Sequence, residues 1–259
     1  MIMKPLYSNN FPKKDQGLIV SYLFNHGQGE LIHNYALDNE LNATMTSTTK
    51  PLWVSNGLDF RSTLSYVEAA RNVKMEPTKF TLVFRFLLRT IGVTKVFFVK
   101  SASNWNGGFS CYTEASNSIR FNLKGIVIDI PFTDTSEYHT CICKWDGSYI
   151  SIQIDKSTVT PVYTGAQSLA STGAFTLGGD KIFLSNYSMD GFVEYFRFYN
   201  YVLSEDAVNT LIESPYEEFK SISLLSSLLG AYAPSILPTT MYKRNKHFGP
   251  NALPIGIGL

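Results

Sequence analysis

The chain has 259 residues, of which 44% are hydrophobic and 14% aromatic, so it is long enough to bury a sizeable core. Its 22 lysines and arginines balance 21 aspartates and glutamates, and the net charge of +1 gives no overall field that would hold nucleic acid. No run reaches the ~20 apolar residues that cross a bilayer, and the opening MIMKPLYSNNF has no apolar signal core. We therefore expect neither membrane insertion nor a signal peptide.

Strand signals recur along the chain, and turn residues such as Asn-Gly, Asp-Gly and Gly-Gly separate them. Regularly spaced short strands of this kind are typical of a β-sandwich that forms one main domain. The patterns predict strands over residues 17–24, 58–62, 65–70, 79–90, 95–100, 108–114, 118–124, 138–145, 148–155, 173–178, 181–184 and 190–200.

Residues 191–210 are the most informative segment, because an alternating strand runs directly into a capped helix. Ser204 is a favourable N-cap, Glu205 and Asp206 lie at the positive end of the helix dipole, and Pro215 bounds the far end. Alternation places Phe192, Glu194, Phe196 and Phe198 on one face of the strand, and Val193, Tyr195, Arg197 and Tyr199 on the other.

Five segments in this order resemble laminin-G-like, concanavalin-A-type jelly-roll domains: residues 17–24, 56–69, 79–89, 138–155 and 191–210. The match has departures, since Tyr138 stands where the family has tryptophan and Arg61 and Ser62 stand where Asp-Gly is usual. The resemblance covers roughly residues 17–213. It implies an all-β, antiparallel jelly-roll sandwich with one short C-terminal helix, followed by an extended arm.

Composition changes after the helix, which divides the chain into a lead segment at 1–16, the jelly-roll domain at 17–215 and a docking segment with a Pro-rich basic arm at 216–259. The string LIESPYEEF at 211–219 and the basic tail resemble those of laminin-G-like proteins of tailed-bacteriophage particles. The resemblance implies a virion protein whose partners are other virion proteins or copies of itself; the alternative is a cytoplasmic or unconventionally exported binding domain. The predicted docking residues are Phe219, Leu225, Leu229, Lys243, Arg244 and Lys246.

The sequence contains none of the catalytic motifs considered below, so we expect a protein that is not an enzyme. The E-x-D-x-x-E strand of jelly-roll glucanases does not occur, and neither does a G-x-S-x-G elbow or a phosphate-binding glycine loop. We interpret Asp134 as a solvated turn residue. The histidines at 26, 33, 139 and 247 are scattered along the chain and do not have the spacing of metal ligands. Cys111, Cys141 and Cys143 read as buried free thiols. No cofactor is required.

A glycan site is predicted at Trp105, because a large aromatic side chain in a Gly-rich loop has no strand face to fill. Asn104 and Asn106 flank it and would read sugar hydroxyls, with bacterial surface polysaccharide as the ligand. The alternative is a tryptophan folded back as a lid on the sandwich.

A structural Ca²⁺ is the metal that the resemblance implies, and the matching positions are Asp38 and Glu194. The alternative is that Glu194 pairs with Arg197 or caps loop amides. The sequence thus predicts a non-enzymatic virion recognition protein with a glycan-binding jelly roll, anchored by its arm. Two alternatives are a decoration or assembly protein without sugar binding, and a polysaccharide-active glycosidase.

Overall fold

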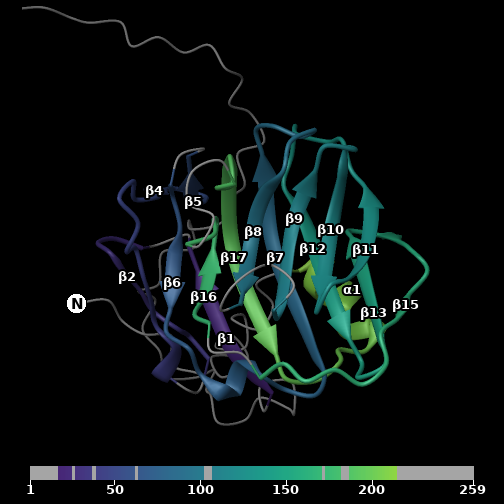
Figure 1. Ribbon diagram of the computed structural model, residues 1–259. Coiled ribbons are helices and arrows are strands. Elements are labelled where there is room, and N and C mark those ends of the chain that lie inside the picture. The colour runs from purple at the N-terminus through teal and green to yellow at the C-terminus, as the bar shows by residue number, and fades with distance from the viewer. Residues whose placement is uncertain are drawn as a thin grey trace, which may run out of the picture. The chain divides into compact units, whose positions relative to one another are not determined.

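The computed structural model describes residues 17–24, 27–36, 39–61, 64–101, 107–170, 173–181 and 187–214 (Figure 1). Within these residues two antiparallel sheets pack face to face, and one α-helix lies against the outside of one sheet. The expected all-β jelly-roll sandwich with a short C-terminal helix is confirmed. No helix of the described part is long and apolar enough to cross a membrane.

Among the described residues the two longest strands are β7 Phe80–Leu88 and β17 Gly191–Tyr199, which have nine residues each and lie at the centre of sheet A. Its strands are β1 Leu18–Leu23, β4 Leu52–Val54, β5 Gly57–Phe60, β7 Phe80–Leu88, β12 His139–Trp145, β13 Tyr149–Ile154, β14 Ser157–Thr158, β15 Val162–Tyr163 and β17 Gly191–Tyr199. They follow the order β14-β13-β12-β7-β17-β5-β4, while β1 also pairs with β17 and β15 with β13.

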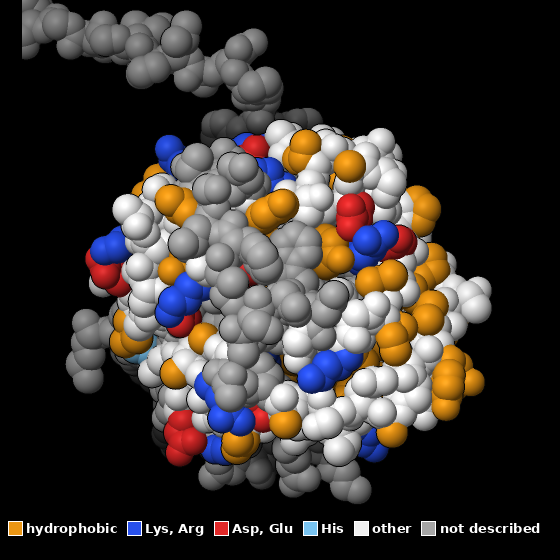
Figure 2. Space-filling view, in the orientation of Figure 1, with side chains coloured by type: hydrophobic (Ala, Val, Ile, Leu, Met, Phe, Trp, Pro, Cys, Tyr) orange, Lys and Arg blue, Asp and Glu red, His pale blue; other side chains and the backbone are white. Residues whose placement is uncertain are grey.

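Sheet B faces sheet A across the core. Its strands are β2 Leu31–Ile32, β3 Ala43–Thr44, β6 Val67–Ala69, β8 Lys95–Lys100, β9 Phe109–Glu114, β10 Ser118–Leu123, β11 Ile126–Pro131 and β16 Phe175–Leu177, in the order β11-β10-β9-β8-β16-β6-β3-β2. Two 3₁₀ turns, η1 Asn39–Leu41 and η2 Val73–Met75, lie in the connections. Charges of both signs meet on the face over β10 and β11 (Figure 2), where Arg120 pairs with Asp129 and Glu114.

Alternating aromatic side chains build the core between the sheets. On β7 the inward positions include Phe80, Phe84 and Phe86, all fully buried. Phe80 packs 5.1 Å from Phe109 of sheet B, and Phe109 stacks on Phe198 of β17 at 5.9 Å between ring centroids. Aromatic pairs at such distances add to the free energy gained by burying the rings.

The helix α1, Glu205–Glu213, begins and ends where the sequence predicts. The Ser204 hydroxyl accepts a hydrogen bond from the Ala207 N–H at 3.3 Å, as an N-cap does. The buried helix residues Val208 and Leu211 pack in one cluster with outward side chains of sheet A, among them Val83 of β7. The helix therefore covers part of the outer face of sheet A.

The predicted faces of β17 are wrong at its start, because the strand contains a β-bulge. Val193 pairs with Phe86 and Tyr195 with Arg85, so Glu194 is the extra residue. The bulge puts Val193 in the main core together with Phe196, whereas Tyr195 packs in the outer cluster under α1. A simple period of two cannot hold across an inserted residue.

Candidate functional site

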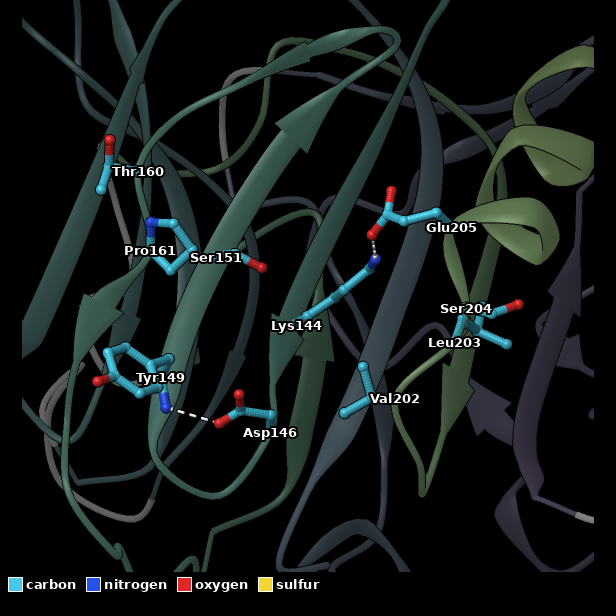
Figure 3. A pocket seen from close by; sticks show the side chains of 10 residues that line it. All are labelled: Lys144, Asp146, Tyr149, Ser151, Thr160, Pro161, Val202, Leu203, Ser204 and Glu205. Carbon is cyan, nitrogen blue, oxygen red and sulfur yellow. Dashed lines mark hydrogen bonds and ion pairs between the residues drawn. The ribbon is translucent and has the colours of Figure 1, made fainter.

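An open hollow of about 690 Å³ lies on the outer face of sheet A, between the β12–β13 hairpin and the start of α1 (Figure 3). The hairpin forms one wall, and the loop that enters the helix forms the other. Its lining combines one aromatic ring with charged and hydroxyl side chains: Lys144, Asp146, Tyr149, Ser151, Thr160, Pro161, Val202, Leu203, Ser204 and Glu205.

The hairpin turn fixes the first wall. Asp146 Oδ1 accepts the N–H groups of Ser148 and Tyr149 at 2.8 and 2.7 Å, and Gly147 supplies the left-handed conformation of the turn at φ +101°. The predicted Asp-Gly turn is therefore confirmed. These bonds leave Asp146 Oδ2 without a hydrogen bond from the described residues, and they hold Tyr149 at the first position of β13.

Two tyrosines stand exposed beside the hollow. Tyr149 of β13 pairs in register with Tyr163 of β15, and their rings meet edge to face at 5.2 Å. Thr164 donates two hydrogen bonds to the Ser148 carbonyl, one from its N–H at 2.7 Å and one from its Oγ1 at 3.0 Å. These bonds fix β15 to the hairpin. Tyr149 is 46% exposed and Tyr163 is 66% exposed, so the pair forms a solvent-exposed aromatic surface.

The second wall is held by hydrogen bonds to the sheet. The Leu203 N–H donates to Thr81 Oγ1 at 3.0 Å, and that hydroxyl donates to the Tyr201 carbonyl at 3.0 Å. Lys144 crosses from β12 to the helix start, where its Nζ lies 2.7 Å from Glu205 Oε1 (Figure 3). The carboxylate and the ammonium of this pair are presented at the same side of the hollow.

The lining suits a hydroxyl-rich ligand. Aromatic rings contact the apolar face of a sugar, and carboxylate, ammonium and hydroxyl groups exchange hydrogen bonds with its hydroxyls. Lys144 and Tyr149 stand on strands, and Glu205 is the first residue of the capped helix, which keeps these groups in place. The arrangement is an open surface whose polar groups are held in fixed positions.

The predicted glycan residues Trp105, Asn104 and Asn106 lie outside the described residues, as do all the predicted docking residues in the C-terminal segment. The site at Trp105 stays a prediction. The same holds for the docking role of the arm.

Glu194, one of the two predicted calcium ligands, takes part in an ion pair on sheet A. Its Oε2 lies 2.6 Å from Nε of Arg85 on the neighbouring strand, and both side chains are largely buried. Arg197, the partner that the sequence suggested, is fully buried, with its guanidinium 4.7 Å from the Tyr195 ring centroid. Asp38 lies outside the described residues, so calcium binding by the two carboxylates stays a prediction.

The three cysteines are buried free thiols, as predicted. Cys111 of β9 faces Cys141 and Cys143 of β12 across the core, and the last two sulfurs lie 3.9 Å apart. Burial raises the pKa of each thiol well above its ordinary value, so all three stay protonated at neutral pH.

Sequence reasoning missed the tyrosine pair. Tyr149, Ser151 and Gln153 alternate with the core residues of β13, and this alternation would have placed Tyr149 on the outward face. The register that brings Tyr163 beside it depends on β15, a two-residue strand too short to show a period.

Comparisons with known proteins agree with the observed fold. Residues 61–209 match the model of the concanavalin A-like lectin/glucanases superfamily. Among solved structures, Trypanosoma rangeli sialidase matches with a TM-score of 0.64 and 14% identity over 78% of this chain and 33% of the sialidase.

A mutant of HCR D/C VPI 5995 matches with a TM-score of 0.57 and 15% identity, over 77% of this chain and 52% of that one. The matches thus span only part of each solved protein, and at these identities they show the fold alone. The comparison with curated proteins gave no match. On the strength of the matched residues, the chain belongs to the concanavalin A-like lectin/glucanases superfamily.

Proposed function

We propose that this chain is a glycan-binding module that acts without catalysis, with Tyr149 and Tyr163 as its sugar-stacking surface. The exposure of this aromatic pair beside a hollow lined by Asp146, Lys144 and Glu205 carries the proposal. Large aromatic side chains left in water next to convergent polar groups are typical of ligand sites. Membership in a superfamily of lectins and glucanases supports the same ligand class.

The biological setting in this proposal is a bacteriophage particle, on which the domain recognises bacterial surface polysaccharide. Its support is the sequence alone, namely the string at 211–219 and the Pro-rich basic segment that follows. In this setting the segment after residue 215 anchors the protein to other virion proteins or to copies of itself.

Binding to a panel of bacterial surface polysaccharides tests the proposal with the full chain. We expect Tyr149→Ala and Tyr163→Ala each to weaken binding by about 1 to 3 kcal/mol, roughly 5- to 150-fold in Kd, as the loss of an aromatic anchor does. Tyr187→Ala is the matched control, because Tyr187 is exposed and its backbone pairs with β8 in the other sheet. Trp105→Ala tests the loop that the sequence predicts.

The outcomes separate the alternatives. Weakening by Trp105→Ala alone would move the site to that loop. No binding to any polysaccharide, combined with retention on particles, would favour a decoration or assembly protein. Release of reducing sugar by the purified chain, lost on Asp146→Asn or Glu205→Gln, would show a polysaccharide-active enzyme and contradict the proposal.

A further inference from the structure

The loop between β11 and β12 brings two carboxylates to a buried histidine. Asp134 and Glu137 lie in this loop, and His139 is the first residue of β12. One carboxylate oxygen from each acid and one imidazole nitrogen all lie within 4.8 Å of one another. Interpreting Asp134 as a solvated turn residue and His139 as an isolated histidine missed this short D-x-x-E-x-H spacing.

The imidazole of His139 is held in one orientation. Its Nδ1 lies 2.7 Å from Asp155 Oδ2, and Asp155 Oδ1 accepts the Thr140 N–H at 2.8 Å. The ring also packs edge to face on Phe132 at 5.0 Å between centroids. Because a carboxylate can only accept, the hydrogen bond to Asp155 places a proton on Nδ1 and leaves Nε2 as the ring nitrogen that can bind a metal.

The Nε2 atom of His139 is buried without a hydrogen bond. His139 is only 7% exposed, and Nε2 makes no hydrogen bond with the described residues. The nearby Asp134 Oδ2 lies 3.4 Å away, and it is aimed at the ring because Oδ1 accepts both the N–H and the Oγ–H of Ser136, at 2.7 and 2.6 Å. His139 Nε2 and Asp134 Oδ2 thus face each other.

We propose that Asp134, Glu137 and His139 bind a zinc ion, with Asp155 as the residue that positions the histidine. Two ligands about 2.1 Å from a tetrahedral zinc lie about 3.4 Å apart, which is the observed separation of Nε2 and Asp134 Oδ2. Glu137 is exposed and its side chain can close the remaining gap, and water completes the shell. An imidazole nitrogen favours zinc over calcium or magnesium, which prefer oxygen ligands alone.

The hydrogen bond from the other ring nitrogen to a carboxylate is a recurrent feature of zinc-bound histidine. This site is separate from the hollow, because His139 and Lys144 lie five residues apart on β12, roughly 17 Å at strand spacing. It also shares no residue with Asp38 and Glu194. A zinc ion there would fasten the β11–β12 loop to the start of β12.

Calorimetric titration of the chelator-treated full chain with zinc chloride, in excess magnesium and calcium, tests the site. We expect one zinc per chain. Asp134→Asn and Glu137→Gln should each weaken binding by at least about tenfold, and Asp155→Asn by about 10- to 100-fold. Glu30→Gln, an exposed glutamate that pairs with Lys50 beside β2 at the far edge of sheet B, should leave zinc binding unchanged.

The buried thiols are the competing zinc ligands, so two further measurements separate them. Cobalt bound in place of zinc should show visible absorption without a thiolate charge-transfer band, and Cys141→Ala and Cys143→Ala should retain the metal. The proposal is overturned if no stoichiometric zinc binds, if Asp134→Asn and Glu137→Gln bind zinc as the unaltered chain does, or if only the cysteine variants lose it.

Discussion

Gly178 and Gly29 share a left-handed backbone but differ in their surroundings. Gly178 has φ +84° and Gly29 has φ +75°. A Cβ on Gly178 would overlap the fully buried ring of Phe60, whereas nothing lies within 4 Å of the same position on Gly29. The two glycines therefore separate the cost of backbone strain from the cost of overpacking.

We predict that Gly178→Ala lowers the free energy of unfolding by about 3 kcal/mol, the sum of left-handed strain and overpacking. Gly29→Ala should cost only about 1 kcal/mol, because strain acts alone there. Urea unfolding of both variants measures the difference. Equal losses would mean that the core beside Phe60 relaxes freely and that the packing described for it is wrong.

At the scale of elements, the long strands and the helix follow from the sequence, whereas the edge strand β11 and five strands of two or three residues do not. β7, β12, β13 and β17 carry patterns of six or more residues, long enough for a period of two to show. β2, β3, β4, β14 and β15 have two or three residues each and were not predicted, because pairing rather than periodicity defines them. The predicted strand at 181–184 lies almost wholly outside the described residues.

The edge strand β11 is the clearest miss, since its six residues alternate between core and solvent. Lys124 and Gly125, both at positive φ, form the tight turn that leads into it. A lysine is not typical of a left-handed turn position, so the sequence did not predict this turn. Pro131 ends the strand, as the lack of an N–H allows at an edge. The zinc proposal could not come from sequence either, because Asp155 orients His139 from 16 residues away.

The three thiols buried between β9 and β12 make the free energy of unfolding fall at alkaline pH. Burial raises the pKa of Cys111, Cys141 and Cys143. In the unfolded chain these thiols ionise near pH 8.5, so above that pH the unfolded state holds fewer protons than the folded state. Their contribution is therefore fully present below pH 8.5 and is lost as pH rises.

We predict that the free energy of unfolding falls by about 1.4 kcal/mol per pH unit for each thiol between pH 9 and 10, about 4 kcal/mol per unit for three. Urea unfolding across this range measures the slope. Cys143→Ala should reduce the slope by about a third, whatever its effect on stability at pH 7. A slope that is flat, or equal in the variant, would show that the thiols ionise in the folded protein.

At the scale of the whole molecule, the chain divides into a compact unit at residues 1–219 and a second unit at 220–259. The core clusters of the described residues lie entirely within the first unit. The sandwich thus has the hydrophobic core that independent folding requires. The second unit carries the predicted docking leucines and the basic cluster.

We predict that deletion after Phe219 lowers the Tm of the sandwich by only a few degrees, which corresponds to about 1 kcal/mol for a domain of this size. The same deletion should abolish stable incorporation into an oligomer or particle, measured by co-sedimentation. Unfolding of the truncated chain would place the C-terminal segment in the core. Assembly of the truncated chain at full occupancy would refute the docking role.

Under the proposed function, sugar binds at the tyrosine pair on the outer face of sheet A. An NMR titration of the isotope-labelled chain with the polysaccharide fragment that binds best locates the contact directly. We expect the amide signals of Tyr149, Ser151, Tyr163 and Glu205 to shift together and to saturate with one Kd. Shifts confined to Gly107 and Gly108, which follow the Trp105 loop, with those four signals unmoved, would contradict it.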